Sequence, residues 1–566
     1  MKTVRNILSA VLIITLLFTF TPLLPASDSG GRGDADGSVY AAAAVPDDII
    51  RVHLSSYGEK TSFTMAASGD HTIADNDTAL SGSFTVSVSK KKVKLKAGSK
   101  TYTLDSDVTI SADSKDPASL IKISGGYSYP GDLRILVKSG KLKLVNIIDY
   151  ETYTMGVLPY EVGEGAPAES QKAQAVAART FAYYVANSRT RASQEHDVVN
   201  TTMSQLYNGY DASKTKCIAA VNATAGQVLT TPKGGTVYTC FSSSNGGHTE
   251  LPKNSGAAAT NFEYLPYKED PYDLKYSLGS TSYSAQLTIP KTLTLTNLKN
   301  SSKQPYPMLR SALEDAGINV SGLKAKMTVK SVKLTAPRYT TPDKHCFTGA
   351  DIKVTVPKAG TAAAISTTLS FGSYVDSSKI KRPFLNSVLK LSNKSKFSSL
   401  YLKKGKSSFL LAAVRYGHSA GMSQAGANQM ATDGKTYEDI LSFYYLLGSK
   451  TRLVTKGWST ESGEDELIEV PDPDKVKADK AKADKAKATA KAKTKAKAKA
   501  KVVKGRVNIK NGTLNIRKGA GTKYKVLFSL KKNKTVTILK TKGSWYQIKY
   551  GKKTGYANST YIKKLK

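Results

Sequence analysis

Apolar and polar residues alternate in short runs from Ile49 to about Ile148. The runs "SFTVSVSKKKVKLK" and "LRILVKSGKLKLVNII" are examples, and Gly, Asn and Asp stand between such runs. Alternation with a period of two gives a strand one apolar and one polar face, and the intervening residues favour turns. This part of the chain therefore predicts β-strands joined by hairpins.

A helical period replaces the alternation in "GVLPYEVGEGAPAESQKAQAVAART", residues 156–180. Pro167 suits the first turn of a helix, which we predict to end near Ser188. Lys172 and Arg179 are seven residues apart and are predicted to share one face. Apolar residues at helical spacing are predicted to face the core: Ala173, Val176, Ala177, Phe181, Tyr184 and Val185.

The rest of the large region mixes both patterns. We expect a helix at about 216–224, strands in "GQVLTTPKGGTVYTCF" and "ADIKVTVP", and a short helix in "YPMLRSALEDAG" closed by Gly317. The stretch "RYGHSAGMSQAGANQMATDGKTYEDILSFYY", residues 415–445, is predicted to hold two helices in its second part. The region therefore predicts a mixed α+β fold with β-rich segments.

The character of the chain changes at about Glu461, where an acidic patch precedes a long Lys/Ala run. Ala and Lys favour helix, but like charges four residues apart oppose it, so residues 461–504 are expected to form an extended linker. Its composition fits a soluble spacer and a cationic holder of an anionic polymer equally well. Residues 505–566 alternate strand-like runs with Gly and Asn turns and predict a small all-β barrel.

The N-terminus has a basic start and then an apolar stretch from Ile7 to about Leu24, followed by small residues. This is the layout of a secretory signal peptide. We therefore predict a signal peptide and a disordered leader at residues 1–44. An uncleaved membrane anchor is the alternative, which two prolines at the end of the stretch disfavour.

Lys and Arg outnumber Asp and Glu by 83 to 44 among 566 residues, which gives a formal net charge of +39. Such an excess implies an anionic partner, and export directs that expectation to polymers of the cell envelope rather than to nucleic acid. Three cysteines are too few for a disulfide framework, although one pair stays open. Nothing in their spacing fits a metal site, so we expect no metal and no cofactor.

Two stretches of the C-terminal unit carry a family resemblance. The strand and turn "LNIRKGAG" and the later "SWYQIKYGKKTGYANSTYI" are similar to the corresponding parts of the bacterial Src-homology-3-like (SH3-like) domains. Such domains commonly bind peptidoglycan, often its peptide part. The resemblance therefore implies a cell-wall-binding domain at residues 505–566, with its aromatic residues divided between the core and a peptide groove.

Three motifs stand in order along the large region. The second and third are "TTMSQLYNGY" with "SSSNGGHTE", and "GHSAGMSQAGANQMATDGKTYEDILSFYY". The first is the stretch 156–180, and its matching positions are Glu161, Glu169, Lys172, Gln174, Ala177, Arg179 and Thr180. Together the motifs make residues 48–455 resemble the stage II sporulation protein D/LytB (SpoIID) family.

The resemblance implies one of two functions. Active members are lytic transglycosylases, which cleave the bonds between N-acetylmuramic acid and N-acetylglucosamine in peptidoglycan glycan strands. Other members are described as enhancers of an N-acetylmuramoyl-L-alanine amidase. We therefore expect a secreted, wall-associated enzyme of cell-wall remodelling or sporulation that acts on glycan strands and contacts anionic wall polymers. In the second reading the protein is non-catalytic and a wall amidase is its partner.

Glu161, just ahead of the predicted helix, is the candidate catalytic residue. One carboxyl group suffices for a lytic transglycosylase, because the 6-hydroxyl of the sugar attacks C1 and the same glutamate can give and take a proton. Burial would raise the pKa of Glu161, and a nearby cation would lower it. The alternative is a surface charge near a helix start. The resemblance adds candidate substrate-binding residues: Lys172, Arg179, Gln205, Tyr207, His418 and Gln424.

Some of these residues also have an ordinary structural role as an alternative. Lys172 and Arg179 would also suit ordinary salt bridges, and His418 would also suit a core histidine at a Gly-rich turn.

The chain departs from the family pattern at two points. Ala166 stands where the family often has an aromatic residue, which puts sugar stacking in doubt. The segment "HDVVNTTMSQLY" lacks the Cys and His through which some members bind zinc, so we predict no structural zinc.

Overall fold

The computed structural model describes residues 48–459, 465–468 and 503–565, with gaps at 75–76, 113–118, 189–193, 324, 358–363, 372–397, 523 and 552. The predicted signal peptide and leader, and most of the predicted linker, lie outside the described residues. The chain divides into two compact units, Met1–Val470 and Pro471–Lys566. Each unit is built on hydrophobic cores of its own.

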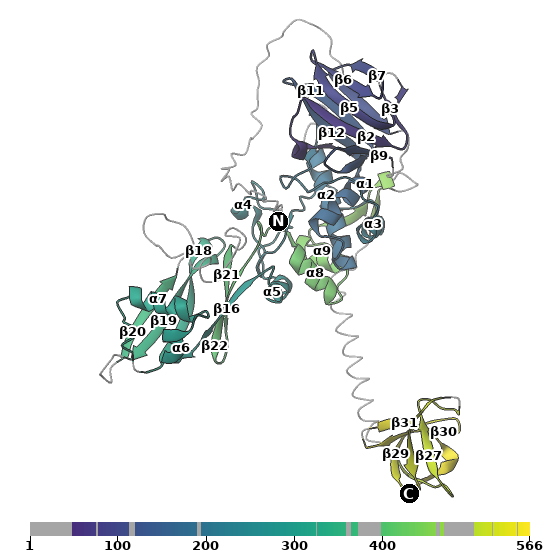
Figure 1. Ribbon diagram of the computed structural model, residues 1–566, viewed down its shortest axis with the longest axis vertical. Helices are drawn as coiled ribbons and strands as arrows, with labels where there is room; N and C mark the ends of the chain where they lie inside the picture. The colour runs from purple at the N-terminus through teal and green to yellow at the C-terminus, as the bar shows by residue number, and fades with distance from the viewer. Residues whose placement is uncertain are drawn as a thin grey trace, which may run out of the picture. The chain divides into compact units, whose positions relative to one another are not determined.

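Two sheets form the N-terminal part of the larger unit (Figure 1). One has the strand order β13 (Val198–Val199), β1 (Ile49–His53), β12 (Lys141–Asp149), β11 (Asp132–Lys138), β8 (Asp107–Ala112), β3 (His71–Ile73) and β4 (Thr78–Ala79). The other has the order β10 (Ser128–Pro130), β9 (Leu120–Ile123), β2 (Ser62–Ser68), β5 (Gly82–Ser89), β6 (Lys92–Ala97) and β7 (Lys100–Leu104). Their apolar faces share one core, as the alternation predicts: Val93 and Leu95 of β6 are buried between exposed lysines.

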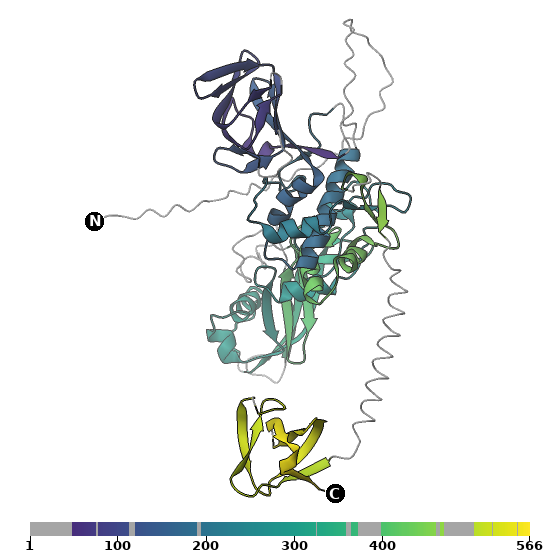
Figure 2. The same ribbon diagram turned by 90° about the vertical axis from the view of Figure 1, so that its right-hand side faces the viewer.

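Three helices follow these strands: α1 (Tyr150–Glu161), α2 (Ala168–Asn187) and α3 (Thr215–Asn222). Both views show α1 and α2 beside the strands of the first sheet (Figures 1 and 2). Helix α2 is enclosed on three sides. Ala178, Ala182 and Ala186 join the core of the two sheets, Ala173 and Val176 join a second core, and Ala175 packs near α3. Alanine at these positions lets the neighbouring elements approach α2 closely.

The second core lies under the remaining motifs. Its elements are α4 (Pro252–Ser255), α5 (Pro271–Leu278), α8 (Gln424–Thr432), α9 (Tyr437–Tyr445), the paired strands β15 (Phe241–Ser242) and β23 (Met422–Ser423), and a sheet of β14 (Gln227–Thr230), β24 (Arg452–Thr455) and β25 (Glu466–Ile468). Helices α8 and α9 pack on the side of α2 that faces away from the first sheet's core. Three non-adjacent stretches of sequence therefore share α2 as their common support.

A segment with its own core is inserted between α5 and β23. It contains a sheet of β16 (Ala285–Pro290), β22 (Ser408–Val414) and β21 (Ser399–Lys404), a sheet of β17 (Thr292–Leu293), β18 (Met327–Tyr339), β19 (His345–Pro357) and β20 (Ala364–Phe371), and helices α6 (Leu295–Asn300) and α7 (Tyr306–Asp315). Its residues form one hydrophobic cluster. The insert therefore folds as a separate layer within the larger unit.

The C-terminal unit is an antiparallel sheet of seven strands around one small core. The strand order is β28 (Val526–Lys531), β27 (Thr513–Arg517), β31 (Lys553–Asn558), β30 (Trp545–Tyr550), β29 (Thr535–Lys542), β26 (Val503–Val507) and β32 (Ile562–Lys564). A 3-10 turn, η5 (Ser559–Tyr561), joins β31 to β32. The α+β class and the all-β C-terminal unit predicted from the sequence are confirmed.

The elements around Glu161 differ from the sequence prediction at one point. The predicted helix is α2, which begins at Ala168 after Pro167 and is capped at Ser188, as expected. The sequence prediction missed a further helix, α1, which starts at Tyr150, directly after β12. Glu161 is therefore the last residue of a helix and not a charge near a helix start. The C-terminal end of a helix disfavours a negative charge.

Within the described residues, no helix combines the length and apolar character needed to cross a membrane. The three cysteines, Cys217, Cys240 and Cys346, are buried and carry free thiols. The disulfide that the sequence left open is therefore not formed.

Arg179 ties the layers around α2 together. Its side chain is fully buried, and Nη2 donates to Glu151 Oε2 at 2.7 Å while Nη1 donates to the Gln227 carbonyl at 3.0 Å. Glu151 in turn accepts a hydrogen bond from the Gly226 amide at 2.8 Å. These contacts join α2 to the first turn of α1 and to the start of β14. Lys172, seven residues earlier on the same helix, has different surroundings, because it stays partly exposed and pairs with Glu169 at 2.8 Å.

We expect Arg179→Met to lower the free energy of unfolding of the larger unit by about 3–5 kcal/mol, because it leaves Glu151 without its buried partner. Lys172→Met on the same helix is the matched control and should change it by less than about 1 kcal/mol, since its ion pair is partly exposed. Urea unfolding of both variants beside wild type measures the difference. Equal losses in the two variants would contradict the structural role of Arg179.

Candidate active site around Glu161

Helix α1 delivers Glu161 to the site. Asp149 caps this helix by accepting a hydrogen bond from the Thr152 amide at 2.8 Å. A Cβ atom at Gly156 would lie 2.5 Å from both the Tyr207 ring and the Gly209 carbonyl oxygen, so only glycine permits this close contact. Helix α1 consequently lies directly against residues 207–209.

The Glu161 carboxyl group is partly buried and bonds to two other segments. Its Oε1 atom accepts a hydrogen bond from the Leu206 amide at 2.8 Å. The side chain of Gln424 forms a second hydrogen bond to the carboxyl group. Glu161, Leu206 and Gln424 come from the first, second and third sequence motifs. The fold therefore brings all three motifs together at one carboxyl group.

Gln205 and Tyr207 hold the Leu206 amide from inside the core. Both side chains are buried. Gln205 donates to the Ala178 carbonyl at 3.3 Å and accepts from the Tyr153 hydroxyl at 2.9 Å. The Tyr207 ring packs 5.1 Å from that of Tyr153. These contacts fix the backbone between the two residues, and binding of substrate by either side chain stays a prediction.

A tight turn places Gln424 opposite Glu161. Gly421 has a φ of +68°, and a Cβ atom there would lie 2.0 Å from the Cys240 carbonyl oxygen. Ser423 then caps α8 by accepting a hydrogen bond from the Gly426 amide at 3.0 Å. Gln424 is the first residue of α8, so the cap fixes the direction in which its side chain leaves the helix.

A buried carboxylate of α5, Asp273, supports this turn, and the sequence analysis missed it. Asp273 accepts hydrogen bonds from the Ser423 hydroxyl and from the amides of Asn245 and Gly246 at 2.9 Å. Burial and the neighbouring Asp270 raise the pKa of Asp273 to about 6. An Asp followed by Pro, as at 270–271, is an N-cap signal, and it could have located the start of α5 but not these partners.

His418 lies in the same Gly-rich turn and is uncharged near neutral pH. Its Nδ1 atom accepts a hydrogen bond from the Ala420 amide at 3.1 Å, and the ring also bonds to the Phe241 backbone. Burial lowers the pKa of His418 to about 4, and the positive charge of Arg415 acts in the same direction. These contacts stabilise the turn, and a contact of His418 with substrate stays a prediction.

The surroundings of Glu161 act on its pKa in opposite directions. Burial raises the pKa of the carboxyl group, and the hydrogen bonds from Leu206 and Gln424 lower it by stabilising the charged form. Burial is the larger effect, so the pKa of Glu161 lies above its ordinary value. Lys172 and Arg179 form their ion pairs with Glu169 and Glu151. The group is therefore disposed to hold a proton.

Among the described residues, no group of three or more His, Cys, Asp and Glu side chains is arranged to hold a metal ion. His196, the histidine of the segment "HDVVNTTMSQLY", lies 3.3 Å from the Lys143 ammonium through Nδ1. Its ring packs against that of His53 at 5.0 Å.

Comparison with known families adds to this geometry. Residues 138–231 match the family model described as stage II sporulation protein (SpoIID), and residues 512–563 match the bacterial SH3 domain. The first match includes Glu161 and Leu206, and Gln424 lies beyond it. The SpoIID family is associated with cell-wall remodelling and sporulation.

Three curated relatives share the larger unit. An uncharacterized protein of Brachyspira hyodysenteriae is 28% identical over 325 residues, which are 56% of this chain and 71% of that protein. An amidase enhancer of Bacillus subtilis is 31% identical over 294 residues, which are 51% of this chain but 39% of that protein. Stage II sporulation protein D of Bacillus subtilis is 27% identical over 314 residues, which are 53% of this chain and 74% of that protein.

The chain spans well under half of the amidase enhancer and most of the other two relatives. The two family matches fall in separate compact units, one of which holds the three motifs and the other the antiparallel sheet. The chain thus carries a SpoIID family domain followed by a C-terminal bacterial SH3 domain, with distant homology to an amidase enhancer and to stage II sporulation protein D.

Proposed function

We propose that this chain is a lytic transglycosylase that cleaves the MurNAc–GlcNAc bonds of peptidoglycan glycan strands, with Glu161 as its acid and base. The observation that carries the proposal is a carboxyl group with a raised pKa at the junction of three motifs. The SpoIID match and the association of that family with the cell wall supply the substrate class.

The reaction needs two proton transfers at one position. Protonated Glu161 gives its proton to the glycosidic oxygen as the bond to C1 breaks. The 6-hydroxyl of the same sugar then attacks C1 and closes a 1,6-anhydro ring, and the Glu161 carboxylate takes up the hydroxyl proton. The sugar supplies its own nucleophile, so a second carboxylate for water activation is not needed.

The contacts of Glu161 suit both halves of this cycle. Burial favours the protonated acid at the start. Once the proton has left, the Leu206 amide and the Gln424 side chain are in place to stabilise the carboxylate. Because Gln205 and Tyr207 fix the Leu206 backbone, no large rearrangement is needed between the two steps.

In this proposal the protein acts at the cell wall. The predicted signal peptide would export the chain, and the SH3 domain would hold the protein on wall material. The linker predicted from the sequence would let the catalytic unit reach strands near the point of attachment. Lys172, His418 and Gln424 remain candidate substrate contacts in this proposal.

A second function is favoured by one comparison. The relative described as an amidase enhancer is 31% identical to this chain. In that case the protein would bind the wall and stimulate an amidase without cutting glycan strands itself, and Glu161 would serve only to join α1 to α8.

Glu161→Gln should lower release of anhydro-muropeptides from purified sacculi by about 10³-fold, because the amide can neither give nor take the proton. Soluble products of intact and amidase-treated sacculi are identified by mass spectrometry. Glu164→Gln is the matched control: it lies three residues away, binds the Lys216 and Cys217 amides, and should keep activity.

Full activity of Glu161→Gln would remove this residue from the mechanism. A wild-type protein that binds sacculi, yields no anhydro ends on either substrate and stimulates an amidase would establish the enhancer function instead. Preference for one sacculus preparation would show whether stem peptides must be removed first.

The pH profile of the cleavage rate gives a second test. Activity should fall as pH rises through the raised pKa of Glu161, because the acid loses its proton there. The hydrogen bond from Gln424 lowers that pKa, so Gln424→Met should move the alkaline limb to higher pH. Gln429→Met on the same helix is the control and should leave the limb in place. A limb that stays fixed or moves to lower pH in Gln424→Met would contradict the assignment.

A further inference from the structure

The C-terminal domain has an extreme charge composition. Residues 503–566 contain sixteen lysines and two arginines and neither Asp nor Glu. This domain therefore carries a large part of the chain's net charge of +39. Like charges on a small domain repel one another and destabilise the compact state. A domain that keeps this charge without a single acidic residue is suited to a polyanionic ligand.

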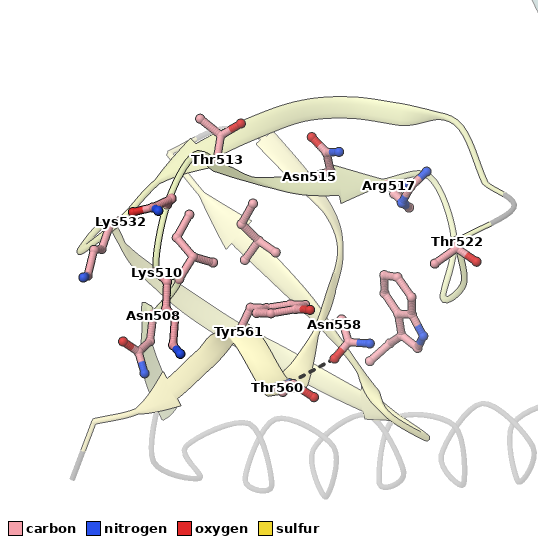
Figure 3. Close-up of a pocket in the computed structure, with 14 residues that line it drawn as sticks. Asn508, Lys510, Thr513, Asn515, Arg517, Thr522, Lys532, Asn558, Thr560 and Tyr561 are labelled. Atoms are coloured by element: carbon pink, nitrogen blue, oxygen red, sulfur yellow. Dashed lines mark hydrogen bonds between the residues drawn. The ribbon is translucent and has the colours of Figure 1, made fainter.

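Three of these eighteen cations line one groove. The groove has a volume of about 790 Å³ and no acidic residue in its wall. Lys510 and Lys532 lie at one end and Arg517 at the other, with Tyr561 between them (Figure 3). Arg517 is held at the wall because Nη1 donates to the Tyr524 carbonyl at 2.8 Å.

The part of the groove between the cations is polar and partly aromatic. Asn508, Asn515 and Asn558 line it together with Trp545 and Tyr561. Asn558 caps η5 by accepting a hydrogen bond from the Thr560 amide at 3.0 Å, which fixes the turn that carries Tyr561. The Tyr561 side chain remains 46% exposed although the neighbouring Ile562 is buried. An exposed ring on a fixed turn is available to stack on a sugar or a polyol chain.

This order of groups matches a repeating ligand. Cations at both ends suit phosphates spaced along a polymer, and amides with an aromatic ring between them suit the hydroxyl-rich unit that separates two phosphates. A neutral peptide would offer the three cations no anionic partner. The groove therefore fits a phosphodiester-linked chain of polyols or sugars better than a peptide.

We propose that the groove of the C-terminal domain binds a phosphodiester-linked polyol polymer of the cell wall. The choice of a wall polymer over a nucleic acid rests on the function proposed above and on the amides that line the groove between the cations, whereas the preference for polyphosphate ligands rests on the cations alone. The domain thus holds the protein where anionic polymer is dense and not merely where peptidoglycan is present.

The test measures binding of the full-length protein to soluble poly(glycerol phosphate) of defined length by isothermal titration calorimetry. Lys510→Gln/Lys532→Gln should weaken binding about tenfold, since two phosphate contacts are lost. Lys540→Gln/Lys549→Gln removes the same charge from exposed strand positions outside the groove and should change it less than about twofold. Equal weakening by both pairs would show diffuse charge attraction and overturn the groove site.

Asn515→Asp is a second, independent variant. Its new carboxylate keeps the acceptor that Asn515 offers to the Ser529 hydroxyl at 2.7 Å, so the fold should persist. A negative charge in the groove should weaken polymer binding at least as much as the lysine pair does. Unchanged binding would overturn the proposal.

Two further ligands test whether the groove prefers the wall polymer to a nucleic acid or to a peptide. A single-stranded oligonucleotide with the same number of phosphates should bind less tightly than the polyol polymer, and phosphate-free muropeptides should compete weakly. Tighter, groove-dependent binding of the oligonucleotide would indicate a nucleic-acid site, and groove-dependent binding of muropeptides alone would indicate a peptide site. No glycan strand is present, so failure here leaves the Glu161 test standing, and failure of glycan cleavage leaves polymer binding standing.

Discussion

The close packing of α2 on three sides is the constraint on which the site depends. Every segment that meets at Glu161 is bonded to this helix. Arg179 fixes α1 through Glu151, the Ala178 carbonyl holds Gln205, and Ser170 donates to Asn428 of α8 at 2.6 Å. A change in the position of α2 would therefore move the carboxyl group and both of its hydrogen-bond partners together. The many alanines of α2 permit this close packing, because their side chains are small.

Two opposing effects act on the pKa of Glu161, and both depend on how its neighbours are positioned. Burial alone would favour a permanently neutral acid, and hydrogen bonds alone would favour a permanent carboxylate. In the proposed mechanism Glu161 exchanges a proton twice, which needs a balance between the two effects. The Leu206 amide cannot rotate away, because Gln205 and Tyr207 are anchored in the core on either side of it. Contacts in the core thus help to set the pKa of Glu161.

Much of the fold could be predicted from the sequence, but the roles of several residues could not. Period-two alternation located the strands, and Pro167 with the apolar spacing located α2. Helix α1 was missed because no loop separates it from β12: Asp149 is both the last residue of the strand and the N-cap of the helix. Gln205 and Tyr207 match a family motif, and a motif shows that a residue is needed without showing whether it contacts ligand or core. The partners of Asp273 lie on segments distant in sequence, so no local pattern could reveal them.

The inserted segment between α5 and β23 has a consequence for how the protein folds. Glu161 and Leu206 lie before the insert in the chain, and Gln424 lies after it. Contacts between residues so distant in sequence form late, because a long loop must first be closed. We expect the carboxyl group to gain its second partner after the insert has collapsed onto its own core, because this collapse brings the two ends of the insert together. In a partly folded chain the environment of the acid would be incomplete, so the proposed chemistry would begin only once folding is complete.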